Sequence, residues 1–170
     1  MSEQKGSIEL TQLDVTNESD IIQLGDALKG RPIDHLMLNA GVLGDDCATL
    51  GQMTQASWLQ VLSVNTVAPA LLIQALSDNV AASEHKTIVG ISTRVASLSD
   101  NSSGNMYSYR ASKVALNQIL VSAAKNLEAQ GVKTLAIHLV GFKRTWVEIM
   151  RHLLLKKVHW VLLVSLKASL

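Results

Sequence analysis

Short apolar runs alternate with longer segments of helical periodicity over most of this chain. Four runs have the length and composition of strands, namely Ile8–Val15, Ile33–Leu38, Thr87–Ile91 and Val132–His138. Apolar residues at intervals of three and four predict helices over Glu18–Leu28, Gln55–Asn79 and Met106–Gln130. Pro69 lies inside the second helix and predicts a kink there. This alternation predicts an α/β fold with a parallel sheet, right-handed crossovers and helices on both faces.

Polar or small residues stand at the ends of three of the expected strands. They are Asp14 and Val15, then Asn39-Ala40-Gly41, and finally Ser92 and Thr93. In open parallel sheets, ligands bind outside the carboxyl ends of the strands. The pattern therefore predicts one binding edge, although a turn or a helix cap would also account for Asp14, and a strand-end turn for residues 39–41.

Tyr109 and Lys113 lie four residues apart near the start of the third expected helix, so their side chains share one helix face. A neighbouring ammonium stabilises phenolate and lowers the tyrosine pKa from about 10. Such a phenol suits general acid–base work on a carbonyl or alcohol oxygen. Tyrosine and lysine at this spacing also occur by chance on helices, so the pair alone leaves a packing role open.

The order of these segments along the chain narrows the interpretation. Asp14-Val15, Asn39-Ala40-Gly41, Val64-Asn65, Ile91-Ser92-Thr93 and the run Tyr-Arg-Ala-Ser-Lys-Val-Ala-Leu-Asn follow one another at characteristic intervals. In this order the set resembles the short-chain dehydrogenase/reductase family, and within it the C-factor and sniffer-like carbonyl reductases. The resemblance runs from about Ile8 to His138. It implies an oxidoreductase that uses NAD or NADP to move a hydride to or from a small carbonyl or alcohol. The lone Cys47 fits a reducing compartment, so we expect a cytoplasmic location.

The resemblance also implies a role for each matched residue. Tyr109 would donate or accept the proton at the substrate oxygen, while Lys113 would lower its pKa and hold the nicotinamide ribose. Asn65 would anchor a water molecule that leads from Lys113 to solvent, although a buried asparagine is equally an ordinary satisfied polar group. Thr93, where the family usually has serine, and Ser92 before it would orient the substrate.

At the adenosine end, the resemblance assigns cofactor contacts to the first two strand ends. Asp14 and Val15 would lie at the adenine ring, and Asn39, Ala40 and Gly41 would line the floor beneath the adenosine ribose. The family's glycine-rich phosphate turn has no counterpart here, because Met1 falls just before the strand that is third in the family. We therefore expect a partial Rossmann-like sheet that lacks the first βαβ unit, and impaired or absent activity.

The alternative from another functional class is a non-catalytic interaction protein. It would use the two long helices, Gln55–Asn79 and Met106–Gln130, as a dimer surface; the resemblance implies homo-oligomers paired through these helices. A net charge of +1 among 170 residues gives no overall bias toward nucleic acid or anionic membrane. No apolar run approaches the ~20 residues of a membrane span. The lone Cys47 allows no internal disulfide, and the five histidines show no metal-ligand spacing, so we expect no metal; His35 and His138 are expected to be core residues.

Composition changes abruptly after His138. Residues 139–170 hold six of the fifteen basic residues but only one of the fourteen acidic ones, Glu148. We therefore expect a partial dinucleotide-binding domain over residues 1–138 and an aberrant tail over 139–170. A back-translation of residues 139–148, read two bases later, gives Gly-Trp-Val-Gln-Thr-Asp-Met-Gly-Gly, similar to the family's loop at this place. A shifted reading frame is the preferred hypothesis; a divergent amphipathic helix and a basic adaptor segment (Lys143–Lys157) for anionic partners are the alternatives.

Overall fold

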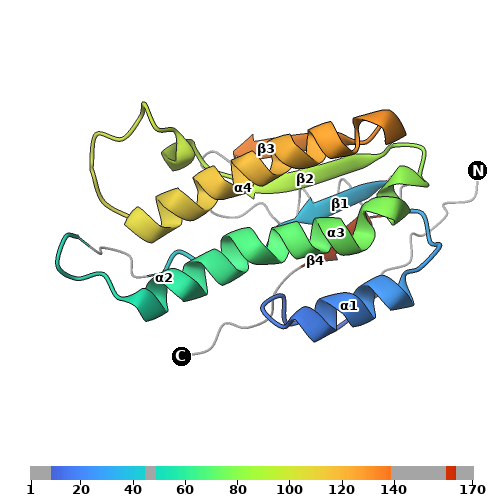
Figure 1. The fold of residues 1–170 in the computed structure, drawn as a ribbon, viewed down its shortest axis with the longest axis horizontal. Coiled ribbons are helices and arrows are strands. Elements are labelled where there is room, and N and C mark those ends of the chain that lie inside the picture. Colours follow the sequence, from blue (N-terminus) through green and yellow to red (C-terminus); the bar gives the residue numbers. More distant parts are fainter. Residues whose placement is uncertain (1–8, 45–48, 139–159, 164–170) are drawn as a thin grey trace, which may run out of the picture.

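The fold is a parallel four-stranded sheet with helices packed on it (Figure 1). A computed structural model describes residues 9–44, 49–138 and 160–163. The strands are β1 (His35–Leu38), β2 (Thr87–Ser92), β3 (Lys133–His138) and β4 (Trp160–Leu163), in the order β3-β2-β1-β4. All three pairings are parallel. The predicted α/β class and the partial Rossmann-like arrangement are confirmed.

The helices follow the predicted segments closely. Helix α1 (Glu18–Ala27) begins at Asn17, whose side chain accepts a hydrogen bond from the Ser19 amide at 3.1 Å. Helix α4 (Tyr107–Asn126) continues into the short 3₁₀ turn η3 (Glu128–Gln130), and a second 3₁₀ turn, η2 (Arg94–Ala96), follows β2.

The long second helix contains the irregularity that Pro69 predicted. Helix α2 (Gln55–Leu62) passes through the π-helical segment η1 (Ser63–Val67) into α3 (Ala68–Ala81). A proline has no amide to donate into the preceding turn, and the wider π turn immediately before Pro69 accommodates that loss. Asn65 lies inside this segment, so the irregularity falls at a predicted site residue.

By length and composition, Gln55–Ala81 is apolar enough to cross a membrane, which the sequence analysis did not find. In the fold, residues of this helix belong to the same buried cluster as strands β1 and β2, as expected for a core helix. Leu72, Leu76 and Val80 are among its buried members. The predicted cytoplasmic location stays a prediction.

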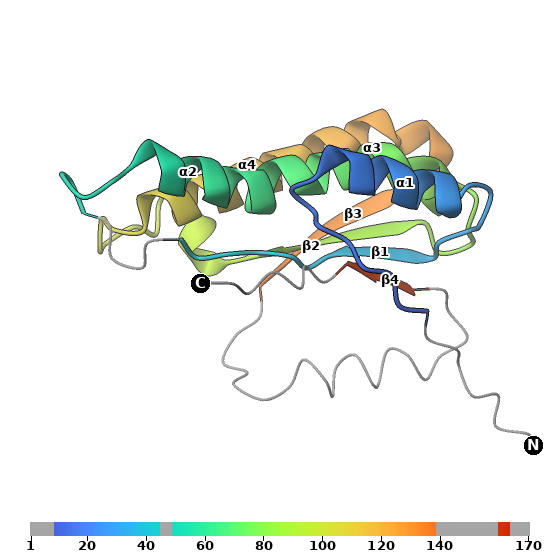
Figure 2. The ribbon, with the colours of Figure 1, turned by 90° about the horizontal axis from the view of Figure 1, so that it is seen from below.

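Helices were expected on both faces of the sheet, and for the described residues this is wrong. Figure 2 shows α1, α2, α3 and α4 all on one face. The strand order explains this, because β1, β2 and β3 are added in one direction across the sheet. Right-handed crossovers that advance in one direction place their helices on the same face. The order reverses only at β4, which pairs with the other edge of β1.

The predicted strand over Ile8–Val15 is also wrong for residues 9–15, which form no strand. In the classic Rossmann order 3-2-1-4-5-6, this segment would pair only with the second strand. Without a neighbour, an apolar run cannot complete a ladder, whatever its propensity. Its apolar side chains are still used, because Leu13 and Val15 are buried in the core. The edge of β1 is instead paired with β4 from the predicted tail; the remainder of the tail lies outside the described residues.

Candidate active site

The predicted site residues gather where the carboxyl ends of β1 and β2 meet the first turns of α4 and the π segment η1. Lys113 is buried, with 5% of its surface exposed. Its Nζ donates a hydrogen bond to the Ile91 carbonyl oxygen at 2.8 Å and lies 5.9 Å from the centre of the Tyr109 ring. Burial lowers the pKa of Lys113 to about 8. The amine is therefore charged at neutral pH and titrates within a unit or so above it.

Tyr109 shares a helix face with Lys113 as predicted, yet its pKa moves opposite to the expectation. Burial raises the pKa of the half-buried Tyr109 phenol. The ammonium of Lys113 is directed at the Ile91 carbonyl, and the loss of hydration on burial is the cause of the shift at Tyr109. In this state Tyr109 is a protonated phenol at neutral pH and a weaker acid than an ordinary tyrosine.

Asn65 clamps the chain that leaves β1. Its Oδ1 accepts the Val42 amide at 2.8 Å, and its Nδ2 donates to the Val42 carbonyl at 2.8 Å and to Ser112 Oγ at 3.0 Å. Ser112 Oγ in turn donates to the Tyr109 carbonyl at 2.7 Å. Asn65 and Ser112 are fully buried, so these bonds form in a dry environment. One network therefore links the exit of β1, the π segment and the first turns of α4.

The sequence analysis missed Ser112, although the residue stands three positions after Tyr109 in the quoted motif. A buried serine on the helix face of the candidate tyrosine was the available signal. The side-chain oxygen and nitrogen of Asn65 are both hydrogen-bonded, to Val42 and Ser112. The asparagine is thus a satisfied polar group in the cofactor-free chain, which was the alternative interpretation of its role.

The two candidate substrate-orienting hydroxyls differ in direction. Ser92 Oγ donates to Asn117 Oδ1 on α4 at 2.7 Å, which fixes the end of β2 to that helix. Thr93 Oγ1 accepts the Val95 amide at 3.4 Å at the start of η2. Because a long backbone contact of this kind is weak, the Thr93 hydroxyl is the freer of the two to bond another oxygen.

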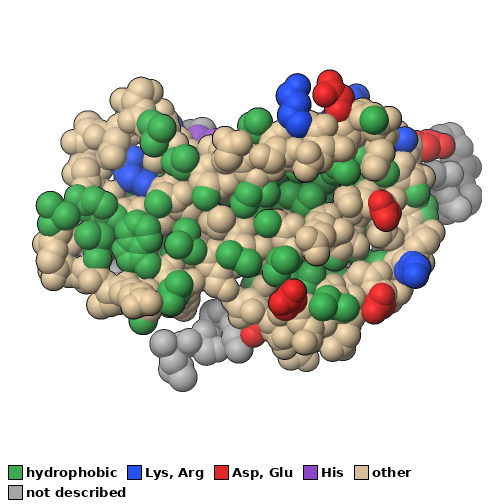
Figure 3. All heavy atoms as spheres, in the orientation of Figure 1, with side chains coloured by type: hydrophobic (Ala, Val, Ile, Leu, Met, Phe, Trp, Pro, Cys, Tyr) green, Lys and Arg blue, Asp and Glu red, His purple; other side chains and the backbone are tan. Residues whose placement is uncertain are grey.

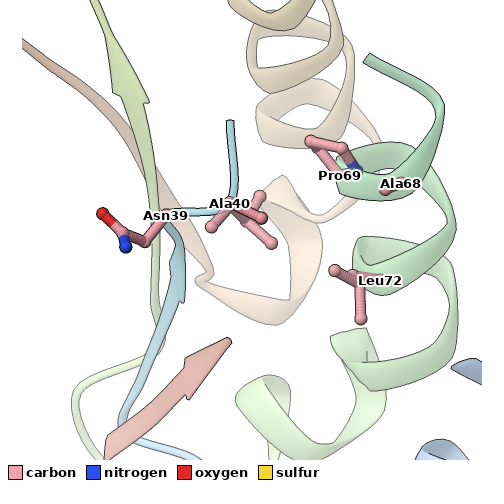
Figure 4. Close-up of a pocket in the computed structure, with 6 residues that line it drawn as sticks. Asn39, Ala40, Ala68, Pro69 and Leu72 are labelled. Atoms are coloured by element: carbon pink, nitrogen blue, oxygen red, sulfur yellow. The ribbon is translucent and has the colours of Figure 1, made fainter. Parts of the chain in front are cut away.

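Residues 39–41 follow β1 and border a shallow recess. Its lining consists of Leu38, Asn39, Ala40, Ala68, Pro69 and Leu72 (Figure 4). The Asn39 amide in Figure 4 is directed away from Pro69 and Leu72, so the recess itself is apolar. At Gly41 a Cβ atom would stand 3.5 Å from Asn65 Oδ1 and 3.5 Å from Lys113 Nζ. The glycine keeps the space beside the lysine amine free of a side chain.

Asp14 is part of the turn that leads into α1. Its Oδ1 accepts the Thr16 amide at 3.0 Å and the Thr16 hydroxyl at 2.7 Å. The Asp14 amide donates to Asp20 Oδ2 at 3.0 Å. This is the turn role that the sequence analysis kept as an alternative. Val15 is buried in the apolar cluster that also contains Leu38 and contacts Ala40.

The histidines correct one prediction. His138, expected in the core, is exposed on β3, because that strand carries exposed side chains on both faces in the described part of the sheet. His35 is half-buried and stacks on His85, with 5.3 Å between ring centroids. Within residues 9–44, 49–138 and 160–163, no group of three or more His, Cys, Asp or Glu side chains could hold a metal ion. Cys47 lies outside the described residues.

Comparison with known proteins agrees with this geometry. The C-signal protein of Myxococcus xanthus is 32% identical over 107 residues, which are 63% of this chain and 64% of that protein. A dehydrogenase of Rhodococcus sp. (strain AD45), named for 1-hydroxy-2-glutathionyl-2-methyl-3-butene, is 32% identical over 128 residues, or 74% of this chain and 55% of that protein. The chain thus spans less than two thirds of the length of either relative.

Solved structures show the same likeness. The carbonyl reductase Sniffer of D. melanogaster superposes with a TM-score of 0.70 at 26% identity, over 77% of this chain and 58% of that one. A short-chain dehydrogenase/reductase from Burkholderia multivorans with bound NADP gives a TM-score of 0.67 at 28% identity, over 75% and 55% of the two chains. A family model described as short chain dehydrogenase matches residues 1–151. The predicted resemblance is confirmed: the chain belongs to the short-chain dehydrogenase family.

Proposed function

We propose that the chain carries the catalytic half of an NAD(P)-dependent carbonyl reductase, with Tyr109 as proton donor to the substrate oxygen. The observation that carries the proposal is the buried Lys113, whose amine lies 5.9 Å from the Tyr109 ring centre at the carboxyl edge of the sheet. Burying an ammonium is costly, and a buried, charged lysine beside a phenol is a typical feature of a catalytic site.

The residues around Lys113 fit the nicotinamide-ribose end of a dinucleotide. The missing side chain at Gly41 leaves space beside Lys113 Nζ, and that amine can donate to ribose hydroxyls. When bound, the cofactor would supply the hydride. The chain's own residues would supply the rest: the Thr93 hydroxyl would orient the substrate oxygen, and Tyr109 would give it a proton.

Proton transfer sets the pH dependence of the proposed reaction. Tyr109 is protonated at neutral pH, as donation in the reductive direction requires, but its raised pKa makes it a weaker acid, so the transfer depends on stabilisation of the phenolate that forms. After it gives up its proton, the phenolate is stabilised by the positive charge of Lys113. The pKa of Lys113 is about 8, so this support weakens as the pH rises through that value. Reduction is expected to slow on the alkaline side for this reason.

The isolated chain is proposed to bind the dinucleotide weakly, because its residues include no glycine-rich turn that would hold the pyrophosphate at a helix N-terminus. Titration with NADPH, followed by fluorescence and by NMR, tests both the weak binding and the position of the site around Lys113. We expect saturable binding well above ~1 μM, a value that would need about 8 kcal/mol. Lys113→Met should weaken it, whereas Lys125→Met, at an exposed lysine of the same helix, should not. Micromolar affinity contradicts the weak-binding statement, and no effect of Lys113→Met contradicts the site.

A second candidate function is that of an interaction protein, in which two copies of the chain pair through the face formed by the long helices. Hydrophobic side chains gather along the helix-covered face in Figure 3. Leu59 on α2 is 58% exposed, Val67 in η1 is 49% exposed and Val121 on α4 is 56% exposed. Such side chains favour pairing of this face with a second copy. Sedimentation of Leu59→Glu and Val121→Glu variants tests it: a wild-type dimer that these changes do not dissociate argues against this surface.

A further inference from the structure

The segment from Arg94 to Asn105 connects the end of β2 to the start of α4. It therefore joins Thr93, on one side of the candidate site, to Tyr109 on the other. Apart from η2 it has no regular structure, and its residues are mostly small and polar. Ala96 in η2 is buried, but Leu98 is 83% exposed and residues 98–104 are all exposed, so apolar packing holds only the start of the loop.

A single side chain, Arg110, bonds to both ends of this loop. Arg110 Nη1 donates to the Val95 carbonyl at 2.9 Å, and Nε donates to the Asn105 carbonyl at 3.0 Å. Nη2 donates to Ser103 Oγ at 3.0 Å, and Nη1 has a longer contact of 3.5 Å with the Asp100 carbonyl. All three guanidinium nitrogens thus face loop acceptors. A planar fork with fixed donors suits this arrangement, and a lysine ammonium cannot reproduce it.

The residue before α4 supports the same view. Met106 has φ = 59°, a left-handed conformation that is costly for a residue with a side chain. Such a conformation persists only where the surroundings impose it. The Arg110 side chain acts next to this point, because its Nε donates to the Asn105 carbonyl, while the Arg110 amide makes the ordinary first-turn helix bond to the Met106 carbonyl at 2.9 Å. The arginine thereby fixes the turn from which Tyr109 is presented.

We propose that Arg110 is a positioning residue that clasps the loop 94–105 onto the first turn of α4 and so sets the spacing between Thr93 and Tyr109. The clasp itself follows from the contacts above. Its catalytic consequence rests on the proposed function, since only there do Thr93 and Tyr109 share a substrate oxygen. The exposed ion pair between Arg94 and Asp100, at 3.0 Å, contributes little to the clasp because solvent screens it.

Proteolysis of the full chain tests the clasp without cofactor or turnover. Thermolysin cleavage at the exposed Leu98 requires the loop to open, so its rate reports the clasp. We expect Arg110→Ala and Arg110→Lys to raise that rate ~10-fold or more, since each removes charge-assisted hydrogen bonds. Gln118→Ala, at an exposed position of the same helix, is the control and should leave the rate unchanged. Ser103→Ala removes one of the bonds and should give a smaller increase.

Three outcomes would overturn the proposal. They are an unchanged cleavage rate in Arg110→Ala, a wild-type rate in Arg110→Lys, and an equal rise at sites throughout the chain, which would indicate general destabilisation. Turnover is the second measurement, made with residues 9–138 joined to the nucleotide-binding unit and substrate loop of a related reductase: kcat for carbonyl reduction should fall ~10-fold in Arg110→Lys while KM for NADPH stays the same. Absence of turnover in that parent chimaera would refute the proposed function and leave the clasp standing on the cleavage result.

Discussion

Replacing Lys113 with methionine tests the candidate site through the stability of the chain alone. The side chain is 5% exposed, and burial lowers the pKa of Lys113 from 10.5 to about 8. A depression of this size means that holding the ammonium inside the fold costs about 3 kcal/mol relative to water. Methionine has a similar length and no charge, so it removes that cost but also removes the donor to the Ile91 carbonyl, worth about 1 kcal/mol.

The sign of the pH effect follows from proton counting. Between pH 8 and 10.5 the unfolded chain keeps the proton on Lys113 while the folded chain releases it, so the free energy of unfolding rises with pH. For these two pKa values the gain from about pH 7 to about pH 9.5 is about 2 kcal/mol. The Lys113→Met variant lacks this gain. It should therefore be about 2 kcal/mol more stable than wild type near pH 7 and similar to it near pH 9.5.

Urea unfolding followed by far-UV circular dichroism at the two pH values measures this difference. The range stays below the titration of the tyrosines, so their contribution is small and common to both chains. Lys125→Met is the matched control, because Lys125 lies on the same helix with 76% of its side chain exposed. If the wild type and Lys113→Met respond to pH in parallel, the lysine is not buried as described, and the basis of the proposed site is lost.

The remaining predictions concern the fold and the gene. The pKa of His35 is lowered, first by burial and then by His85, so stability should fall as the pH drops through 6.5; His35→Gln should flatten that loss in acid melting curves. Asn79 Nδ2 bonds the Leu28 and Arg31 carbonyls, and Asn79→Leu should cost about 2 kcal/mol in urea unfolding, with Asn126→Leu at the end of α4 as a comparison. Codons 139–148 of the gene should permit the Gly-Trp-Val and Asp-Met-Gly-Gly reading in the shifted frame, and codons that forbid it end that hypothesis.

Local sequence patterns predicted an element well where interactions between residues close in the sequence determine its ends and irregularities. Helix α1 and the π segment before Pro69 follow from capping and from the missing proline amide. The strand predicted over Ile33–Leu38 begins two residues later, because the Ile33 amide bonds the Asn79 carbonyl instead of a strand. Residues 9–15 failed as a strand because pairing depends on a neighbour that an apolar pattern cannot supply.

In the candidate site, too, local features could be predicted from the sequence and tertiary contacts could not. Spacing alone placed Tyr109 and Lys113 together, because helix geometry fixes which residues share a face. It could not predict that the lysine amine bonds the Ile91 carbonyl, or that burial raises the pKa of Tyr109. The contacts of Ser92 with Asn117 and of Arg110 with the loop depend on tertiary packing over long sequence separations. Such contacts carry no periodic signal in the sequence.

The central claim is that Tyr109 donates the proton in a hydride-transfer reaction. Its most direct measurement is NADPH oxidation with simple aldehydes and ketones. The assay uses residues 9–138 joined to the nucleotide-binding unit and substrate loop of a related reductase. The account predicts measurable turnover that falls ~100-fold or more in Tyr109→Phe, which keeps the ring but has no proton to give. Thr93→Ser should retain the activity. Turnover in the Tyr109→Phe variant equal to that of the parent would contradict the account.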